Sequence, residues 1–315
     1  MARKYAAEFL GTIILVFFGA GAAALVLGYR IFGSSPAAGI VAVALAFGLT
    51  YAALVYVIGP ISGGHVNPAV TLGAYITRRM GLIEASGYWV AQLAGGIVGA
   101  LLLWWVMLTS PFFSKPRIGL GANGYGTHSI LRVSGGGAFL VEVIITTFFV
   151  LVVLSLTREK TSTAVSGLGI GIALAVAVLI GIPFDGASVN PARSLGPAVV
   201  TGGAALSQVW VFLVAPMAGG VLAAGLYLLV QPPPVGLLGR RTKTKAAGTQ
   251  PADEQLLPSG QATATVTSPD APVWPVESGP GGAGQVPQQA RENPADTPSR
   301  PRAGRWSHHR ARPRS

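Results

Sequence analysis

The chain has 315 residues, of which 51% are hydrophobic and only 10% are charged, and its mean hydropathy is +0.56. Such an apolar composition excludes an ordinary soluble enzyme and is typical of a protein that crosses the membrane several times. The formal net charge is +11, and the absence of cysteine excludes disulfides and thiolate metal sites.

The first apolar run, residues 5–28, follows Arg3 and Lys4. A signal peptide also has a basic start and an apolar core, but this run is longer than a usual signal core and contains Glu8. Because a spanning helix needs about 20 apolar residues, we predict a membrane helix here. Five further spans are predicted at 37–58, 84–108, 138–157, 164–182 and 207–230.

Two short motifs lie after the second and fifth predicted spans, Gly63–Val70 and Gly186–Arg193, and both contain Asn-Pro-Ala. Asn is a favoured helix N-cap, and Pro fits the first helical position. We therefore expect Asn67 and Asn190 each to begin a short helix. At membrane depth, such a helix end is tolerated only inside protein or along a wet cavity. Two matched ends predict a pore with a positive electrostatic centre.

The two halves of the chain repeat. Ala-Gln-Leu-Ala-Gly-Gly begins at Ala91 and Ala-Pro-Met-Ala-Gly-Gly at Ala215, and Glu8 and Glu142 occupy similar places near the start of each half. With three spans in each half, the second copy enters from the opposite side of the membrane. The sequence thus predicts an inverted repeat, about 5–108 and 138–230, with its functional site at the bilayer midplane.

The positions of Lys and Arg favour a cytoplasmic N-terminus in a multi-pass protein of the plasma membrane, because basic residues gather in cytoplasmic loops. Residues 1–230 form the predicted channel domain. From Gln231 to Ser315 the chain is rich in Pro, Gly and Arg and has no apolar period. We interpret 231–315 as a disordered cytoplasmic tail.

The segments Ser62–Thr71 and Ser188–Ser194 resemble the two signature loops of the aquaporin (major intrinsic protein) family, and the similarity extends from about Ala6 to Leu229. Within the family, Ala44–Thr50 and Ala122–Gly126 are similar to bacterial water channels. The resemblance implies an all-α membrane protein with six transmembrane helices and two half-helices. It also implies a homotetramer with one pore per subunit.

The resemblance assigns roles to individual residues. It implies that the buried acids Glu8 and Glu142 support the two loops, while His65 has two open interpretations, loop packing and a pH switch. Arg193 is permanently charged and costly to bury, which favours a functional place at the outer constriction. The central motifs are Asn67, Pro68, Ala69, Asn190, Pro191 and Ala192; the selectivity filter is Phe47, Val178, Ala187 and Arg193; the pore carbonyls belong to Gly63, Gly64, His65, Val66, Gly186, Ala187, Ser188 and Val189.

The predicted filter departs from the family's strict water pattern. Water channels usually carry His at the position of Val178 and Thr or Cys at that of Ala187, whereas Phe47 is the water-type aromatic. Ser194 and Ala198 match the water class, and Leu213 does not. We expect a wider and more apolar opening than in a strict water filter.

The predicted function is a passive channel for water that also passes some small uncharged solutes. One alternative is a facilitator for glycerol or similar neutral solutes, and another is a coupled secondary transporter. We expect water, small neutral solutes such as glycerol, and the lipid bilayer as partners, and no nucleic acid. We expect neither enzymatic activity nor a cofactor or metal.

Overall fold

The computed structural model describes residues 1–28, 36–113, 119–158 and 163–230. All of these belong to one compact unit, Met1–Ala246. The predicted tail, 231–315, lies outside the described residues. Within the described ranges the secondary structure is helical, without strands.

Six helices are long and apolar enough to cross a membrane, which confirms the six predicted spans. Their mean hydropathy is high because Leu, Val, Ile, Ala and Phe make up most of each helix. They are α1 (Ala2–Ala23, continued by the π-helical turn Ala24–Gly28), α2 (Pro36–Ser62), α4 (Leu82–Leu108), α6 (Gly135–Leu156), α7 (Thr163–Asp185) and α9 (Gly203–Val230).

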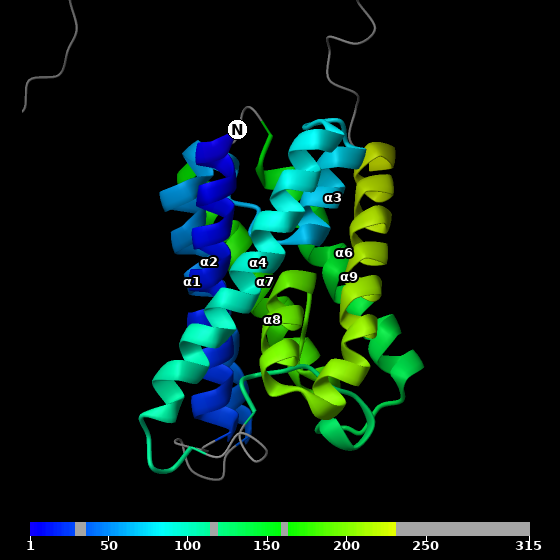
Figure 1. Cartoon of the computed structure of the whole chain (residues 1–315). Coiled ribbons are helices and arrows are strands. Elements are labelled where there is room, and N and C mark those ends of the chain that lie inside the picture. The colour runs from blue at the N-terminus through cyan, green and yellow to red at the C-terminus, as the bar shows by residue number, and fades with distance from the viewer. Residues whose placement is uncertain (29–35, 114–118, 159–162, 231–315) are drawn as a thin grey trace, which may run out of the picture. The chain divides into compact units, whose positions relative to one another are not determined.

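Two short helices follow the two Asn-Pro motifs, as predicted: α3 (Pro68–Ile76) and α8 (Pro191–Thr201). Figure 1 shows α3 in the half of the unit where the N-terminus lies and α8 in the opposite half, both among the long helices. A short 3₁₀ turn, Gly126–His128, lies in the connection before α6.

The helix contacts repeat between the halves. Helix α1 packs on α4 and, equivalently, α6 packs on α9, while α2 and α7 pack on each other and join the halves. Each half-helix also packs against the last long helix of the other half, α3 on α9 and α8 on α4. Because each half-helix packs against a long helix of the other half, the two half-helices lie within one shared core.

Two equivalent glycines allow the half-helices to approach the long helices. A Cβ on Gly96 of α4 would lie 2.2 Å from the carbonyl oxygen of Ala192 at the start of α8. A Cβ on Gly220 of α9 would lie 2.7 Å from the carbonyl oxygen of Ala69 at the start of α3. Because the obstacle in both cases is backbone, a side chain cannot be accommodated without moving a half-helix.

This close approach predicts that Gly220→Ala destabilises the protein by about 1–3 kcal/mol, the usual cost of overpacking. Gly225 lies in the same helix, and a Cβ there would meet nothing within 4 Å. Gly225→Ala should therefore be neutral or stabilising by up to about 1 kcal/mol, because Ala is the better helix former. Thermal unfolding of the two purified variants measures the difference, and equal stability would contradict the proposed approach.

Candidate pore site

The two half-helices begin with the same cap. The Oδ1 atom of Asn67 accepts a hydrogen bond from the backbone N–H of Ala69 at 2.8 Å. The Oδ1 atom of Asn190 accepts from Ala192 at 2.9 Å and from Arg193 at 3.3 Å. Pro68 and Pro191 occupy the first helical positions, where no N–H is required. The capping chemistry of the two motifs is therefore the one that their sequences predict.

The amide nitrogens of the same two asparagines tie the loops together. Asn67 Nδ2 donates to the carbonyl oxygen of Val189 at 2.9 Å, and Asn190 Nδ2 donates to that of Val66 at 2.8 Å. Because Oδ1 makes the cap, the NH2 group of each asparagine is free to point away from its own helix, toward the other loop. An amide nitrogen has two N–H donors, so each asparagine keeps one beyond this bond. The crossed bonds bring the two helix tips together inside the protein.

The loops that lead to the caps have left-handed backbone at matching positions. In the first loop Gly63, Gly64 and Val66 have φ values of 90°, 62° and 41°. In the second loop Gly186, Ala187 and Val189 have φ values of 90°, 53° and 58°. Non-glycine residues adopt such angles only when the surroundings hold them there.

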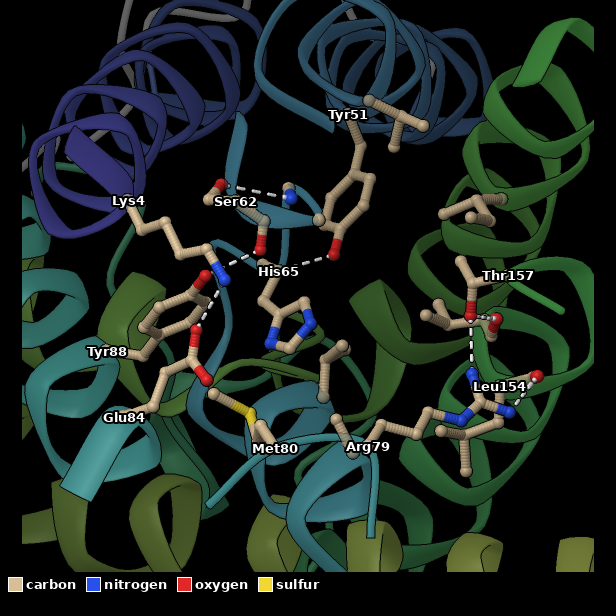
Figure 2. Close-up of a pocket in the computed structure, with 17 residues that line it drawn as sticks. Lys4, Tyr51, Ser62, His65, Arg79, Met80, Glu84, Tyr88, Leu154 and Thr157 are labelled. Atoms are coloured by element: carbon tan, nitrogen blue, oxygen red, sulfur yellow. Dashed lines mark hydrogen bonds and ion pairs between the residues drawn. The ribbon is translucent and has the colours of Figure 1, made fainter. Parts of the chain in front are cut away.

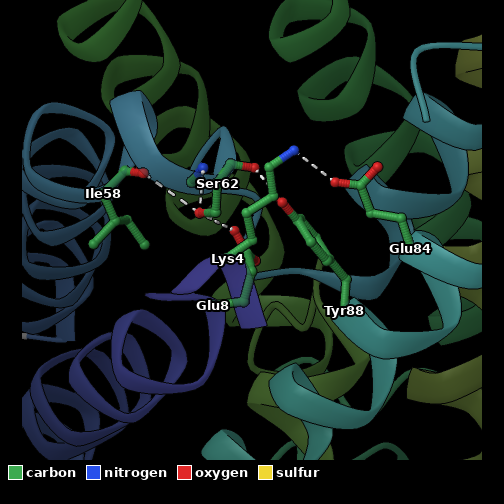
Figure 3. Close-up of polar contacts among 7 residues, drawn as sticks. Lys4, Glu8, Ile58, Ser62, Glu84 and Tyr88 are labelled. Atoms are coloured by element: carbon green, nitrogen blue, oxygen red, sulfur yellow. Dashed lines mark hydrogen bonds and ion pairs between the residues drawn. The ribbon is translucent and has the colours of Figure 1, made fainter. Parts of the chain in front are cut away.

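A completely buried carboxylate holds the first loop. Glu8 of α1 accepts hydrogen bonds from the backbone N–H groups of His65 at 2.9 Å and Val66 at 2.6 Å. It also accepts from the hydroxyl of Ser62 and from Gln92 Nε2, both at 2.7 Å. Figure 3 shows Ser62 beside Glu8. Four donors compensate for the burial of this charge.

Glu142 of α6 has the equivalent place in the second half and is also completely buried. Its two carboxylate oxygens accept from the backbone N–H groups of Ser188, at 2.5 Å, and Val189, at 2.8 Å. Both buried acids therefore bind loop backbone, which is the role that the family resemblance implies for them.

His65 has packing contacts on several sides. Its Nδ1 lies 3.1 Å from the hydroxyl oxygen of Thr71, and its ring meets Tyr88 edge-on at 5.2 Å between centroids. Its carbonyl oxygen accepts from the hydroxyl of Tyr51 at 2.5 Å. These contacts favour loop packing over a pH switch.

Four of the eight predicted pore carbonyls accept hydrogen bonds from the protein. Those of Val66 and Val189 bind the two asparagines, that of His65 binds Tyr51, and that of Gly186 accepts from Arg193 Nη2 at 3.3 Å. A carbonyl oxygen has two lone pairs, so one hydrogen bond to the protein leaves capacity for a second donor.

The four predicted filter residues are all buried. Phe47, Val178 and Ala187 share one hydrophobic cluster. The guanidinium of Arg193 lies over the ring of Phe47, with 5.1 Å between Cζ and the ring centroid. This is a cation–π contact, and it brings the aromatic and the cationic residue of the predicted filter together.

Two residues near Arg193 and its loop were not predicted from the sequence, Asn123 and Asp185. Asn123 Oδ1 accepts from Arg193 Nη1 and, at 2.8 Å, from the hydroxyl of Ser194. Asn123 Nδ2 in turn donates to the carbonyl oxygen of Asp185 at 3.3 Å. Asn123 lies in the segment Ala122–Gly126 that resembles bacterial water channels, but this segment is outside the repeat and gave Asn123 no role. Asp185 could have been found as the repeat partner of Ser62.

A cavity of about 230 Å³ opens beside the first loop (Figure 2). Near it, Lys4 forms an ion pair with Glu84 at 2.8 Å, and Arg79 donates to the Thr157 hydroxyl and the Leu154 carbonyl. In the described ranges, no group of three or more His, Asp or Glu residues could hold a metal. The cavity lining combines the loop with polar and apolar side chains, including Gly63, Gly64, His65, Tyr51, Val55, Val70 and Tyr88.

A comparison with family models identifies the chain. The model described as "Major intrinsic protein" matches residues 1–227. The chain belongs to the major intrinsic protein family. The match covers every α-helix of the described residues except the last three residues of α9.

Among curated members of the major intrinsic protein family, Aquaporin Z of Rhodopseudomonas palustris is 40% identical over 236 residues, which is 75% of this chain and 96% of that protein. Aquaporin Z of Photorhabdus laumondii is 39% identical over 230 residues, 73% of this chain and 98% of that protein. Among solved structures, the aquaglyceroporin from Plasmodium falciparum aligns with a TM-score of 0.63 at 27% identity, covering 72% of this chain and 95% of that one.

The hydrogen bonds of Glu8 predict the effect of Glu8→Gln. The N–H groups of His65 and Val66 bind different carboxylate oxygens. A Gln side chain has one acceptor oxygen, so at least one buried donor loses its partner. We expect a loss of about 1–3 kcal/mol in unfolding free energy, measured by thermal unfolding of the purified protein.

Glu84→Gln is the matched control, because it removes only the ion pair with Lys4, whose side chain is 45% exposed. Such a pair contributes at most about 1 kcal/mol. If the Glu8 and Glu84 variants unfold at the same temperature, Glu8 does not support the loop.

Proposed function

We propose that this protein is a passive transmembrane channel for water that also passes some small uncharged solutes. The observation that carries the proposal is the meeting of two capped half-helix tips in the protein interior, joined by the crossed bonds of Asn67 and Asn190. Membership of the major intrinsic protein family and similarity to proteins named Aquaporin Z support it.

A water molecule that enters the membrane loses its hydrogen bonds, which costs several kcal/mol for each unmatched group in hydrocarbon. The proposed pore replaces them. The remaining N–H groups of Asn67 and Asn190 act as donors at the centre. The carbonyls of Gly63–Val66 and Gly186–Val189 act as acceptors along one wall. Glycines and left-handed residues in these loops turn the backbone toward the file of water.

The same tips exclude ions. Each helix N-terminus is equivalent to about half a positive charge, so two facing tips repel cations at the centre. A water that accepts from both asparagines points its own hydrogens outward, which interrupts a proton-conducting chain. Half-helix dipoles and an Arg form the known barrier to protons and cations in aquaporin-type pores. In this protein we assign the role of that arginine to Arg193.

Selectivity is set, in this proposal, by Phe47, Val178, Ala187 and Arg193. Val178 and Ala187 present only methyl groups, so the constriction offers few polar partners besides the guanidinium. This composition, together with the structural similarity to an aquaglyceroporin, favours glycerol facilitation as the second candidate function.

A coupled secondary transporter is less well supported. Coupling to an ion gradient requires a titratable group that meets the substrate. The buried acids Glu8 and Glu142 instead direct their oxygens to loop backbone. The groups that join the two tips are amides and carbonyls, which do not titrate.

The proposal includes the assembly and placement of the protein. We propose a homotetramer in the plasma membrane, with one pore per subunit, both termini cytoplasmic and 231–315 as a cytoplasmic tail. We propose no enzymatic activity and no cofactor.

The purified protein in lipid vesicles tests the proposed function. Stopped-flow light scattering after an osmotic step should show faster water flux than in empty vesicles, and an inward glycerol gradient should show a smaller acceleration. Fast glycerol flux without accelerated water flux would favour the facilitator instead. Solute accumulation against its gradient, driven by a proton or sodium gradient, would refute a passive channel.

The filter assignment predicts that Val178→His narrows the opening and adds a polar group, so that glycerol flux falls more than water flux. Val178→Thr has nearly the volume of Val and separates polarity from size, so it should change the two fluxes much less. Both fluxes are measured in the same vesicle preparations. An equal loss of water and glycerol flux in the His variant would remove Val178 from the filter.

A further inference from the structure

The two loop supports differ at one equivalent position. Asn190 lies 123 residues after Asn67, and the same offset aligns Ser62, at the end of α2, with Asp185, at the end of α7. A hydroxyl in the first half is therefore replaced by a carboxyl group in the second half. Both side chains are buried, with exposed fractions of 7% and 1%.

In the first half, the Ser62 hydroxyl both donates and accepts, besides a longer contact of 3.4 Å to the carbonyl oxygen of Ile58. Its hydroxyl donates to Glu8 Oε1 at 2.7 Å and accepts from the backbone N–H of Gly64 at 3.2 Å (Figure 3). The serine thus connects the buried acid to the loop, and its proton lies on the side of the carboxylate.

In the second half, Asp185 repeats the contact to the loop, and Glu142 binds the next two N–H groups of the same loop. Asp185 Oδ1 accepts from the backbone N–H of Ala187 at 3.0 Å, in the same way as Ser62 accepts from Gly64. Its carboxyl group also interacts with that of Glu142, the equivalent of Glu8. Among the described residues, no N–H or O–H group donates to Asp185 Oδ2.

Glu142 also lacks a donor that Glu8 has. Gln92 donates to Glu8, and the repeat aligns Gln92 with Pro216, which has no side-chain donor. The charged groups that interact with the Glu142–Asp185 pair are the two carboxyls themselves, from α6 and α7, and Arg193 of α8. From the connection before α6, the neighbour of Asp185 is Asn123, which does not titrate.

Two adjacent buried carboxyl groups cannot both carry a charge at low cost, and such pairs hold one proton between them. We propose that Asp185 and Glu142 share one proton, with Asp185 Oδ2 as the donor and the Glu142 carboxylate as the acceptor. This bond replaces the serine-to-glutamate bond of the first half. It makes Asp185 a positioning residue for the loop that carries Ala187 and Gly186.

The shared proton also balances the charge near the outer constriction. With one proton, the pair has a charge of −1 and Arg193 a charge of +1. Loss of the proton to solvent at alkaline pH leaves two like charges side by side, and their repulsion displaces the loop from Ala187 and from the Gly186 carbonyl that binds Arg193. The flux consequence rests on the proposed channel function, whereas the shared proton does not.

Infrared spectroscopy of the full chain in lipid tests the proton directly. At neutral pH the wild type should show the C=O stretching band of a buried protonated carboxyl group, which shifts in D2O. Asp185→Asn and Glu142→Gln should each abolish that band, and Glu8→Gln should leave it. A wild type without the band, or an Asp185→Asn variant that retains it, would overturn the proposal.

Water flux across a pH series tests the consequence. Asp185→Ser recreates the arrangement of Ser62, so this variant should conduct water at neutral pH and keep its flux at alkaline pH. The wild type should lose flux as the infrared band disappears. Identical pH profiles in the wild type and the Ser variant would overturn the positioning role. If neither conducts water at any pH, the channel function fails while the infrared result still decides the shared proton.

Discussion

The structure depends on one reciprocal interaction, in which each capping asparagine closes its own half-helix and also binds the loop of the other half. Oδ1 of Asn67 satisfies the first turn of α3, and Nδ2 binds the carbonyl oxygen of Val189; Asn190 does the same for α8 and Val66. Each amide side chain thus fixes the start of its own half-helix and holds the loop of the other half within hydrogen-bonding distance. Removing either bond would leave buried polar groups without partners, which is costly away from water. The two tips therefore hold each other at the centre of the protein.

This arrangement requires loops that the chain does not adopt by itself. Val66, Ala187 and Val189 have positive φ angles, and such angles cost of order 1–3 kcal/mol each in non-glycine residues. Buried acids offset this cost, because Glu8 accepts from the N–H of Val66 and Glu142 from that of Val189. The N–H of Ala187 donates to Asp185. A buried carboxylate is expensive unless it is hydrogen-bonded. The strained loop and the buried acid therefore stabilise each other. Without the acid the loop would lose its conformation, and without the loop the buried charge would have too few donors.

The sequence predicted the fold well because its signals are local. A long apolar run predicts a membrane-spanning helix, and a capped Asn-Pro motif predicts a helix start. In a membrane, such segments can adopt few other structures. The six spans and both short helices lie where these signals place them. The side-chain network around the site was not predictable in the same way. Asn123 reaches Arg193 across 70 residues, and Asp185 meets Glu142 across 43, and no periodicity encodes such contacts. The bond from Asn67 Nδ2 to Val189 was not predicted, because its acceptor is a backbone carbonyl 122 residues away.

An inverted repeat makes the differences between its copies informative. Where both halves keep a residue, as with the asparagines and the glutamates, the geometry itself requires that chemistry. Where the two copies differ, the residue in one copy shows which hydrogen-bonding group the other copy must provide through a different residue. The first half provides Glu8 with a hydroxyl and an amide, while the second half offers Glu142 a carboxyl group and a proline at those places. The first loop borders a cavity with Lys4, Arg79 and Glu84 in its lining. The second loop is bound by three buried ionisable side chains, those of Glu142, Asp185 and Arg193. In the second half the charges of two carboxyl groups and one guanidinium must therefore balance within the protein.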